Sequence, residues 1–245
     1  MRILPQDRLF VLTGAGISAE SGLATFRGSG GLWNGHRVEE VATPEAWEAN
    51  PILVWRFYSQ RRRDALAAQP NAAHRALAEI EQRLVHTTPS NFFLCTQNVD
   101  DLHERAGSRR IHHMHGSLFH SRCIRCNRTF PDQSLYETTL PACQSCGSPV
   151  RPHIVWFGEI PLDMDTIYRE LDRATTLLVV GTSGSVYPAA GLVHIARGRN
   201  IRTVYVGPEA PENARAFDEI LLGTATQILP LLLTEAEPAS GSEHP

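Results

Sequence analysis

The sequence predicts an α/β fold built on a doubly wound parallel sheet with helices on both faces. Short apolar runs that fit buried strands alternate along the chain with segments whose apolar residues recur at helical spacing. The first such run, residues 8–13, continues directly into the turn Gly14-Ala15-Gly16, which opens a helix. A length of 245 residues with 42% hydrophobic residues gives this fold ample core and excludes a disordered or fibrous chain.

Local signals place the individual elements. Thr43 before Pro44 and Asn50 before Pro51 are capping residues followed by proline, and they predict helices over 44–49 and 51–68. Asn71 opens another helix, whose apolar residues form one stripe. The other expected helices cover residues 163–173, 188–197, 212–220 and 225–234. The expected strands cover residues 8–13, 91–95, 111–114, 118–122, 153–157, 176–180 and 202–206.

Composition excludes several classes of protein. All 23 positively charged residues are Arg, so P-loop NTPases, Schiff-base enzymes and Ser-Lys nucleophile pairs are excluded. A net charge of −3 gives no basic face for general nucleic-acid binding. No apolar stretch approaches the roughly 18 residues that span a bilayer, and the N-terminus lacks a signal-peptide core. We therefore expect a cytoplasmic protein without membrane association.

Four of the five cysteines form two C-x-x-C pairs, Cys123 with Cys126 and Cys143 with Cys146, separated by sixteen residues. This is the spacing of a zinc ribbon, in which two knuckles place four thiolates tetrahedrally. Four thiolate ligands leave no open coordination position, so the zinc is expected to be structural. The alternative is a pair of redox dithiols. Cys95, in an apolar strand, is expected in the core.

The first glycine turn and the polar run after the strand 91–95 point to a ligand at one sheet edge. Residues 14–19 match G-x-G-x-x-A, where small residues let backbone amides approach a pyrophosphate. The alternative is a tight turn that binds no nucleotide. Gln97, Asn98 and Asp100 follow the strand at its carboxyl end, where doubly wound sheets bind ligands. Glu39 and Glu40 do not end a second strand, which disfavours an ordinary dehydrogenase.

His115 is the candidate base, because it ends a strand near this ligand edge and histidine titrates near neutral pH. His112 and His113 are interpreted as polar residues of the strand end.

These motifs together resemble the sirtuin family of NAD-dependent protein lysine deacylases. The resemblance is carried, in family order, by residues 14–22, 25–28, 96–100, 115–116, the four cysteines, 155–159 and 181–183. It implies one catalytic domain over 1–235, with a Rossmann-like part (about 1–32, 80–117 and 153–235), a helical insertion (about 33–79) and a zinc module (about 118–152). Residues 236–245 form an expected disordered tail.

The resemblance also assigns roles. His115 is the base on the nicotinamide-ribose hydroxyls, Asn98 and Asp100 contact the ribose and the nicotinamide amide, and Gln97 positions the ribose. NAD contacts are further implied for Gly14, Ala15, Gly16, Ile17, Glu20, Phe26, Arg27, Trp33, Val99, Gly181, Thr182, Ser183, Gly207, Pro208, Glu209 and Ala225. The peptide is implied to lie between Val155, Trp156, Phe157, Gly158 and Glu159 on one side and Ser185 and Val186 on the other. Gly207 departs from the family pattern, in which many relatives carry Asn.

Tyr58 and Arg61 lie three residues apart on the expected helix 51–68, so both side chains leave the same face. The Y-x-x-R pattern resembles the sirtuin class that prefers succinyl and malonyl groups, and Arg61 would pair with the acyl carboxylate. The alternative is an amphipathic helix with Trp55 and Tyr58 packed inward and Arg61, Arg62 and Arg63 solvated.

The resemblance implies removal of succinyl, malonyl and also acetyl groups from lysines of cytosolic proteins, with release of nicotinamide and O-acyl-ADP-ribose, by a chain expected to be monomeric. Two other functions stay open. One is a sirtuin-like NAD glycohydrolase or ADP-ribosyltransferase. The other is a non-enzymatic zinc-ribbon module whose Arg122, Arg125 and Arg128 touch phosphates.

Overall fold

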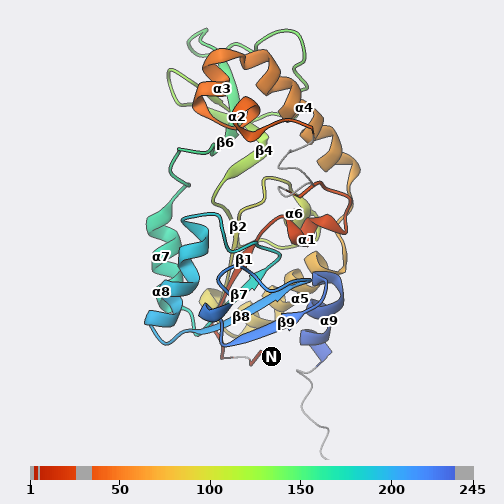
Figure 1. The fold of residues 1–245 in the computed structure, drawn as a ribbon, viewed down its shortest axis with the longest axis vertical. Coiled ribbons are helices and arrows are strands. Elements are labelled where there is room, and N and C mark those ends of the chain that lie inside the picture. Colours follow the sequence, from red (N-terminus) through yellow and green to blue (C-terminus); the bar gives the residue numbers. More distant parts are fainter. Residues whose placement is uncertain (1–2, 5, 26–34, 235–245) are drawn as a thin grey trace, which may run out of the picture.

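The computed structural model describes residues 3–4, 6–25 and 35–234. Its larger sheet has six strands, all parallel, in the order β3-β2-β1-β7-β8-β9. These strands are β1 (Leu9–Thr13), β2 (Phe92–Thr96), β3 (Ile111–His113), β7 (Thr176–Val180), β8 (Arg202–Gly207) and β9 (Glu219–Leu222). The strand order reverses at β1, as in a Rossmann-like sheet, and the predicted fold class is confirmed (Figure 1).

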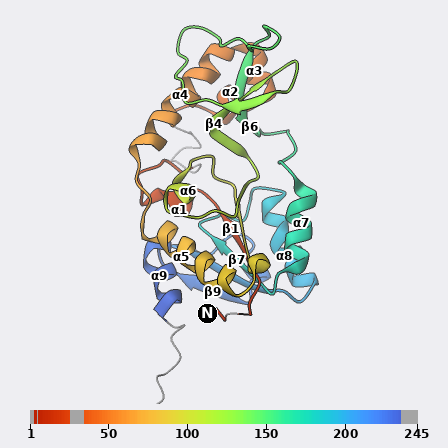
Figure 2. The ribbon, with the colours of Figure 1, turned by 180° about the vertical axis from the view of Figure 1, so that it is seen from behind.

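Helices cover both faces of this sheet because alternate strand residues point to opposite sides. Val11 and Leu178 pack in one core with residues of α5 (Ala72–Thr87) and α9 (Ala225–Thr234). Phe10 and Leu177 pack in a second core with residues of α7 (Met164–Arg173) and α8 (Leu192–Gly198). Figures 1 and 2 show these two helix pairs on opposite sides of the strands.

A second, smaller sheet is antiparallel and has the order β5-β4-β6. Its strands are β4 (Gly116–Cys123), β5 (Thr129–Pro131) and β6 (Val150–Ile154). The helices α2 (Val38–Val41), α3 (Pro44–Ala49) and α4 (Pro51–Ala67) lie beside it at the top of Figure 1. The remaining short helices are α1 (Gly16–Ala19), α6 (Leu102–Arg105), η1 (Pro89–Asn91), η2 (Ala189–Gly191) and η3 (Ala214–Ala216).

The predicted helix caps are present. The Thr43 side chain accepts a hydrogen bond from Ala46 N, and the Asn50 side chain accepts one from Leu53 N, each at 3.0 Å. The Asn71 side chain accepts hydrogen bonds from Ala73 N and His74 N, and the helix that it caps packs on the larger sheet.

Two predicted elements differ from the structure. The helix expected over 212–220 is wrong, because only Ala214–Ala216 is helical and β9 begins at Glu219. Asp218 causes the change, since its carboxylate accepts hydrogen bonds from the backbone N (2.8 Å) and hydroxyl (3.0 Å) of Thr203 and so ties this segment to β8. The strand expected over 153–157 is β6, which ends earlier, at Ile154. Across the described ranges, each helix is either too short or too polar to cross a bilayer.

Candidate functional site

Two glycine turns close on each other at the carboxyl edge of the larger sheet. Gly14 N donates to Val180 O (3.0 Å), and Gly16 N donates to Gly181 O (2.9 Å). A Cβ on Gly16 would lie 2.7 Å from the Gly181 Cα, and Gly181 itself has a φ of +64°. Because only glycine fits both positions, the two turns form one tightly packed floor.

A cavity of about 410 Å³ adjoins these turns and reaches the small domain, by which we mean the sheet β5-β4-β6 together with α2, α3 and α4. The larger sheet contributes residues at its strand ends, and the small domain contributes α4 and the segment after β6. Most of the predicted site residues line it: Gly14, Ala15, Gly16, Tyr58, Arg61, Gln97, Asn98, Val99, Asp100, His115, Val155, Trp156, Phe157, Gly158, Glu159, Gly181, Thr182, Ser183, Val186, Pro208 and Glu209.

Other predicted contacts lie elsewhere in the described part of the chain. Ile17 and Ala225 are buried in the core shared with α5 and α9. The Glu20 carboxylate accepts a hydrogen bond from the Thr226 hydroxyl (2.7 Å) and thereby anchors α9. Ser185 is exposed and is not among the described lining residues of the cavity. Phe26, Arg27, Trp33 and the tail 236–245 lie outside the described residues.

The structure assigns the protonation of His115. Its Nδ1 lies 3.1 Å from the Gln97 carbonyl oxygen, which can only accept, so Nδ1 carries the hydrogen. The lone pair is then on Nε2, in a residue that lines the cavity. Burial lowers the pKa of His115 and outweighs the Gln97 hydrogen bond, which raises it. The imidazole is therefore neutral near pH 7 and able to accept a proton.

A buried polar network fixes the run after β2. The Ser18 hydroxyl donates to the Asp100 carboxylate (3.2 Å) and accepts from the Asn98 side-chain amide (3.2 Å). Burial raises the pKa of Asp100 above its usual range. His113 binds the Asn98 carbonyl (3.0 Å) and the Glu104 carboxylate (2.6 Å). Burial lowers the pKa of His113, but the Glu104 carboxylate and the Asn98 carbonyl raise it, and the net effect is a raised pKa that favours the charged imidazolium.

Tyr58 and Arg61 converge on the cavity from α4. Burial raises the pKa of Tyr58 to about 12, so its hydroxyl stays protonated. Burial lowers the pKa of Arg61, while Tyr58, Asp100 and Asp64 raise it, and a guanidinium keeps its charge in proteins. Tyr58 is 1% exposed, as the packed alternative expected, but Arg62 is fully buried rather than solvated.

The segment after β6 is held from the small domain. Val155 N donates to the His115 carbonyl (2.9 Å). The Glu159 carboxylate accepts two hydrogen bonds from Arg151 (2.7 and 2.8 Å) and one from Trp156 N (2.8 Å). Arg122 also lies 3.6 Å from Glu159, so this Arg is paired within the protein. Glu159 therefore holds the segment 155–159, which lines the cavity, in place through its bonds to Arg151 and Trp156 N.

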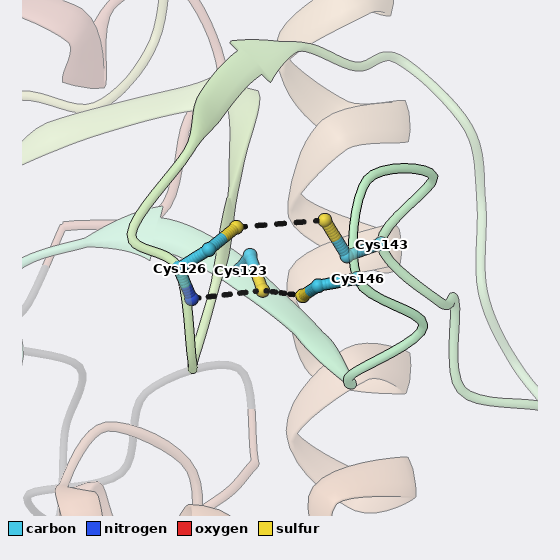
Figure 3. Close-up of side chains that lie close together, drawn as sticks. All are labelled: Cys123, Cys126, Cys143 and Cys146. Carbon is cyan, nitrogen blue, oxygen red and sulfur yellow. Dashed lines mark hydrogen bonds between the residues drawn. The ribbon is translucent and has the colours of Figure 1, made fainter.

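The side chains of the four predicted zinc ligands lie close together, as Figure 3 shows. Their sulfur atoms all lie within 4.8 Å of one another. Cys123 and Cys146 are 3.5 Å apart, and Cys126 and Cys143 are 3.7 Å apart. Tetrahedral zinc with Zn–S bonds of 2.3 Å requires sulfurs about 3.8 Å apart, so the cluster fits this ion. All four sulfurs converge on one point, which a single zinc ion requires and two separate redox pairs do not.

Sequence reasoning missed Tyr205. Its hydroxyl donates to the Thr182 carbonyl (3.1 Å), and its side chain lines the cavity. A Cβ on Gly207 would lie 2.3 Å from the Tyr205 hydroxyl, so the Tyr ring takes the space of a side chain at 207. The pattern that could have shown this is Tyr-x-Gly, since residues two apart in a strand share a face.

A doubly wound sheet with a glycine floor, a neutral histidine and a four-cysteine module defines a nucleotide-binding enzyme with a structural metal module. Comparison with known proteins names the family. The Sir2 family model matches residues 14–188. The NAD-dependent protein deacylase of Caulobacter vibrioides is 51% identical over 225 residues, which cover 91% of this chain and 94% of that protein. The NAD-dependent protein deacylase of Salmonella typhimurium is 46% identical over 242 residues, covering 94% and 85%.

Comparison with solved structures supports the same family. A Sir2 homologue bound to NAD superposes with a TM-score of 0.85 at 43% identity, covering 94% of this chain and 90% of that one. This chain belongs to the Sir2 family, and the predicted resemblance is confirmed. NAD-dependent protein deacylation is the activity that this membership supports.

Proposed function

We propose that this chain removes acidic acyl groups, succinyl and malonyl, and also acetyl groups, from protein lysines in an NAD-dependent reaction that releases nicotinamide and O-acyl-ADP-ribose. The observation that supports the acidic preference is that Tyr58 and Arg61 line the same cavity as His115. A succinyl or malonyl group ends in a carboxylate, which a guanidinium binds by two charge-assisted hydrogen bonds. Acetyl ends in a methyl group, which neither side chain can hydrogen-bond.

The residues of the cavity fit NAD. Gly14, Ala15 and Gly16 line the cavity with small residues, so a pyrophosphate could come close to the backbone there. The buried side chains of Asp100 and Asn98 are polar groups held in fixed positions by Ser18. NAD would supply the ribosyl carbon that accepts the acyl group when nicotinamide leaves. His115 would take a proton from a ribose hydroxyl at Nε2, while the Gln97 carbonyl holds its Nδ1–H.

The zinc module has a different role. The four thiolates would fill the coordination of one zinc ion, so this metal would stabilise the module and take no part in the reaction. Val150, between the second knuckle and the cavity wall, is fully buried with Cys123 and Cys143. The metal cluster thereby supports the segment that carries Trp156 and Glu159.

The test compares succinyl-lysine and acetyl-lysine peptides of the same sequence with wild type and Arg61→Met. Removal of a charged partner from a partly buried pair costs about 2–5 kcal/mol, so the succinyl to acetyl ratio of kcat/KM should fall by more than about tenfold, mainly through KM for the succinyl peptide. Arg63→Met is the matched control, because Arg63 is on the same helix but exposed and paired with Glu137. Equal losses on both peptides would mean that Arg61 supports the fold.

The same assay separates the other functions. A deacylase releases nicotinamide only when an acylated peptide is present, whereas an NAD glycohydrolase releases it from NAD alone. A non-enzymatic module releases none.

A further inference from the structure

Trp156 makes a hydrogen bond whose direction is fixed by chemistry. Its indole Nε1 lies 3.1 Å from the Tyr58 hydroxyl oxygen, and both side chains are buried, with 2% and 1% of their surface exposed. An indole N–H can only donate, so the Tyr58 oxygen is the acceptor. The single hydroxyl hydrogen of Tyr58 must therefore point away from Trp156.

The Tyr58 hydroxyl still has its one hydrogen available to donate. Within the described part of the chain, its hydroxyl makes no hydrogen bond besides the one from Trp156. Tyr58 lines the cavity beside Arg61. A ligand atom in this cavity thus meets the hydroxyl as a donor, and a carboxylate oxygen is the acceptor that suits it best.

We propose that Trp156 is a positioning residue for acyl selectivity, which occupies the acceptor side of the Tyr58 hydroxyl and so presents its O–H to the acyl carboxylate. This inference rests on the proposed function, because it assigns a role only for acidic acyl groups. Trp156 acts through Tyr58 and needs no contact of its own with the acyl carboxylate.

The indole is held firmly enough to fix this direction. The Arg151 guanidinium lies over the Trp156 ring, 3.3 Å from its centroid, and the Trp47 ring packs against it at 5.9 Å. Arg151 is in turn bound by Glu159 and by the Ile154 carbonyl (2.8 Å). Since Glu159 also accepts from Trp156 N at 2.8 Å, backbone and ring of Trp156 are anchored by one ion pair.

The fixed orientation of the Tyr58 hydroxyl would add to the preference for acidic acyl groups over acetyl that Arg61 provides. Without the indole donor, the Tyr58 hydroxyl can rotate and accept as well as donate, so part of its population would present a lone pair to the acyl carboxylate. Two oxygen lone pairs repel, which weakens succinyl and malonyl binding. An acetyl methyl group is indifferent to this rotation.

The experiment is a double-mutant cycle read as the succinyl to acetyl ratio of kcat/KM. Trp156→Phe keeps an aromatic ring under Arg151 and removes the N–H. We expect this ratio to fall by about three- to tenfold, as the loss of one oriented hydrogen bond predicts. In a Tyr58→Phe background, which already lacks the hydroxyl, Trp156→Phe should produce no further fall in the ratio. The matched control is Trp47→Phe, which alters the same aromatic cluster without touching the hydroxyl and should leave the ratio unchanged.

A second substitution separates the N–H from packing. Incorporation of β-(3-benzothienyl)alanine at position 156 keeps the bicyclic ring and replaces the N–H by sulfur, so it serves where Trp156→Phe does not fold. It should reproduce the fall in the ratio with a melting temperature close to that of wild type.

The outcomes are distinguishable. If the succinyl to acetyl ratio falls in Arg61→Met but in neither of the two proteins changed at position 156, this inference alone is overturned. If Trp156→Phe lowers the ratio as much in the Tyr58→Phe background as in wild type, Trp156 does not act through the Tyr58 hydroxyl. That result also overturns the inference. No selective loss in Arg61→Met overturns the proposed function and this inference together.

Discussion

Arg62→Met tests how the small domain is held together. Arg62 is fully buried, and its guanidinium is 3.3 Å from the Asp132 carboxylate and 3.1 Å from the Ser121 hydroxyl. It also donates to two carbonyls and stacks over Trp55 at 5.1 Å. Met keeps the apolar stem and removes every one of these donors.

The expected loss of unfolding free energy is about 3 kcal/mol, at the lower end of the 3–5 kcal/mol for breaking a buried pair. The lower end applies because Asp132 keeps hydrogen bonds from Ser121 and from Ser134 N. Urea unfolding of the zinc-loaded protein at pH 7, followed by Trp fluorescence, measures it. Arg63→Met, an exposed neighbour, should change stability by less than about 0.5 kcal/mol.

The pH dependence provides an independent check. Burial would raise the pKa of Asp132, but the hydrogen bonds from Ser121 and Ser134 and the Arg62 charge lower it below its usual value. A carboxyl with a depressed folded pKa stabilises the fold above its unfolded pKa and loses that contribution as pH falls through the folded pKa. The difference in unfolding free energy between wild type and Arg62→Met should therefore become smaller as the pH falls into the acid range. A cost below about 1 kcal/mol at pH 7, the level of a neutral hydrogen bond, would refute the buried-pair argument.

Two further predictions concern the catalytic and metal sites. His115→Ala should lower deacylation by about 10²–10⁴-fold while calorimetry still detects NAD and peptide binding, and more than a tenth of the rate remaining would remove His115 from the mechanism. Because burial lowers the pKa of His115, wild-type kcat/KM should fall only when pH drops below the ordinary histidine range near 6.5. Cys143→Ser should lose zinc, melt earlier and lose turnover, and a variant without zinc that keeps its melting temperature and full rate would contradict the structural role of the metal.

The sequence predicted those parts of the molecule that local pattern or fixed spacing determines. The strand 176–180 and the cap at Thr43 follow from a few neighbouring residues, and the four cysteines follow from their C-x-x-C spacing. The polar run 97–100 was expected at the ligand edge because parallel strands bring their carboxyl ends to one side.

Features set by distant partners could not be predicted in this way. The segment 212–220 has helical composition, but Asp218 bonds to Thr203, fifteen residues away, and a strand forms. Arg62 lies in a run of three arginines that a sequence pattern takes as solvated, whereas its counter-charge Asp132 is seventy residues further on. Tyr205 could not be predicted as a cavity residue because its role depends on the contact between its hydroxyl and the backbone of Thr182 and Gly207.

Helix α4 connects the zinc module to Tyr58 and Arg61, the two residues proposed to bind acidic acyl groups. One face of the helix joins the zinc module: Trp55 Nε1 donates to Val150 O (2.9 Å), the Ser59 hydroxyl donates to Tyr136 O (3.0 Å), and Arg62 pairs with Asp132. The adjacent face carries Tyr58 and Arg61 into the cavity. Because a helix is stiff along its axis, a module that loses its fold releases the first face and thereby displaces the second. If the proposed acyl preference holds, damage to the cysteine cluster should therefore lower the succinyl to acetyl ratio of kcat/KM in addition to lowering turnover.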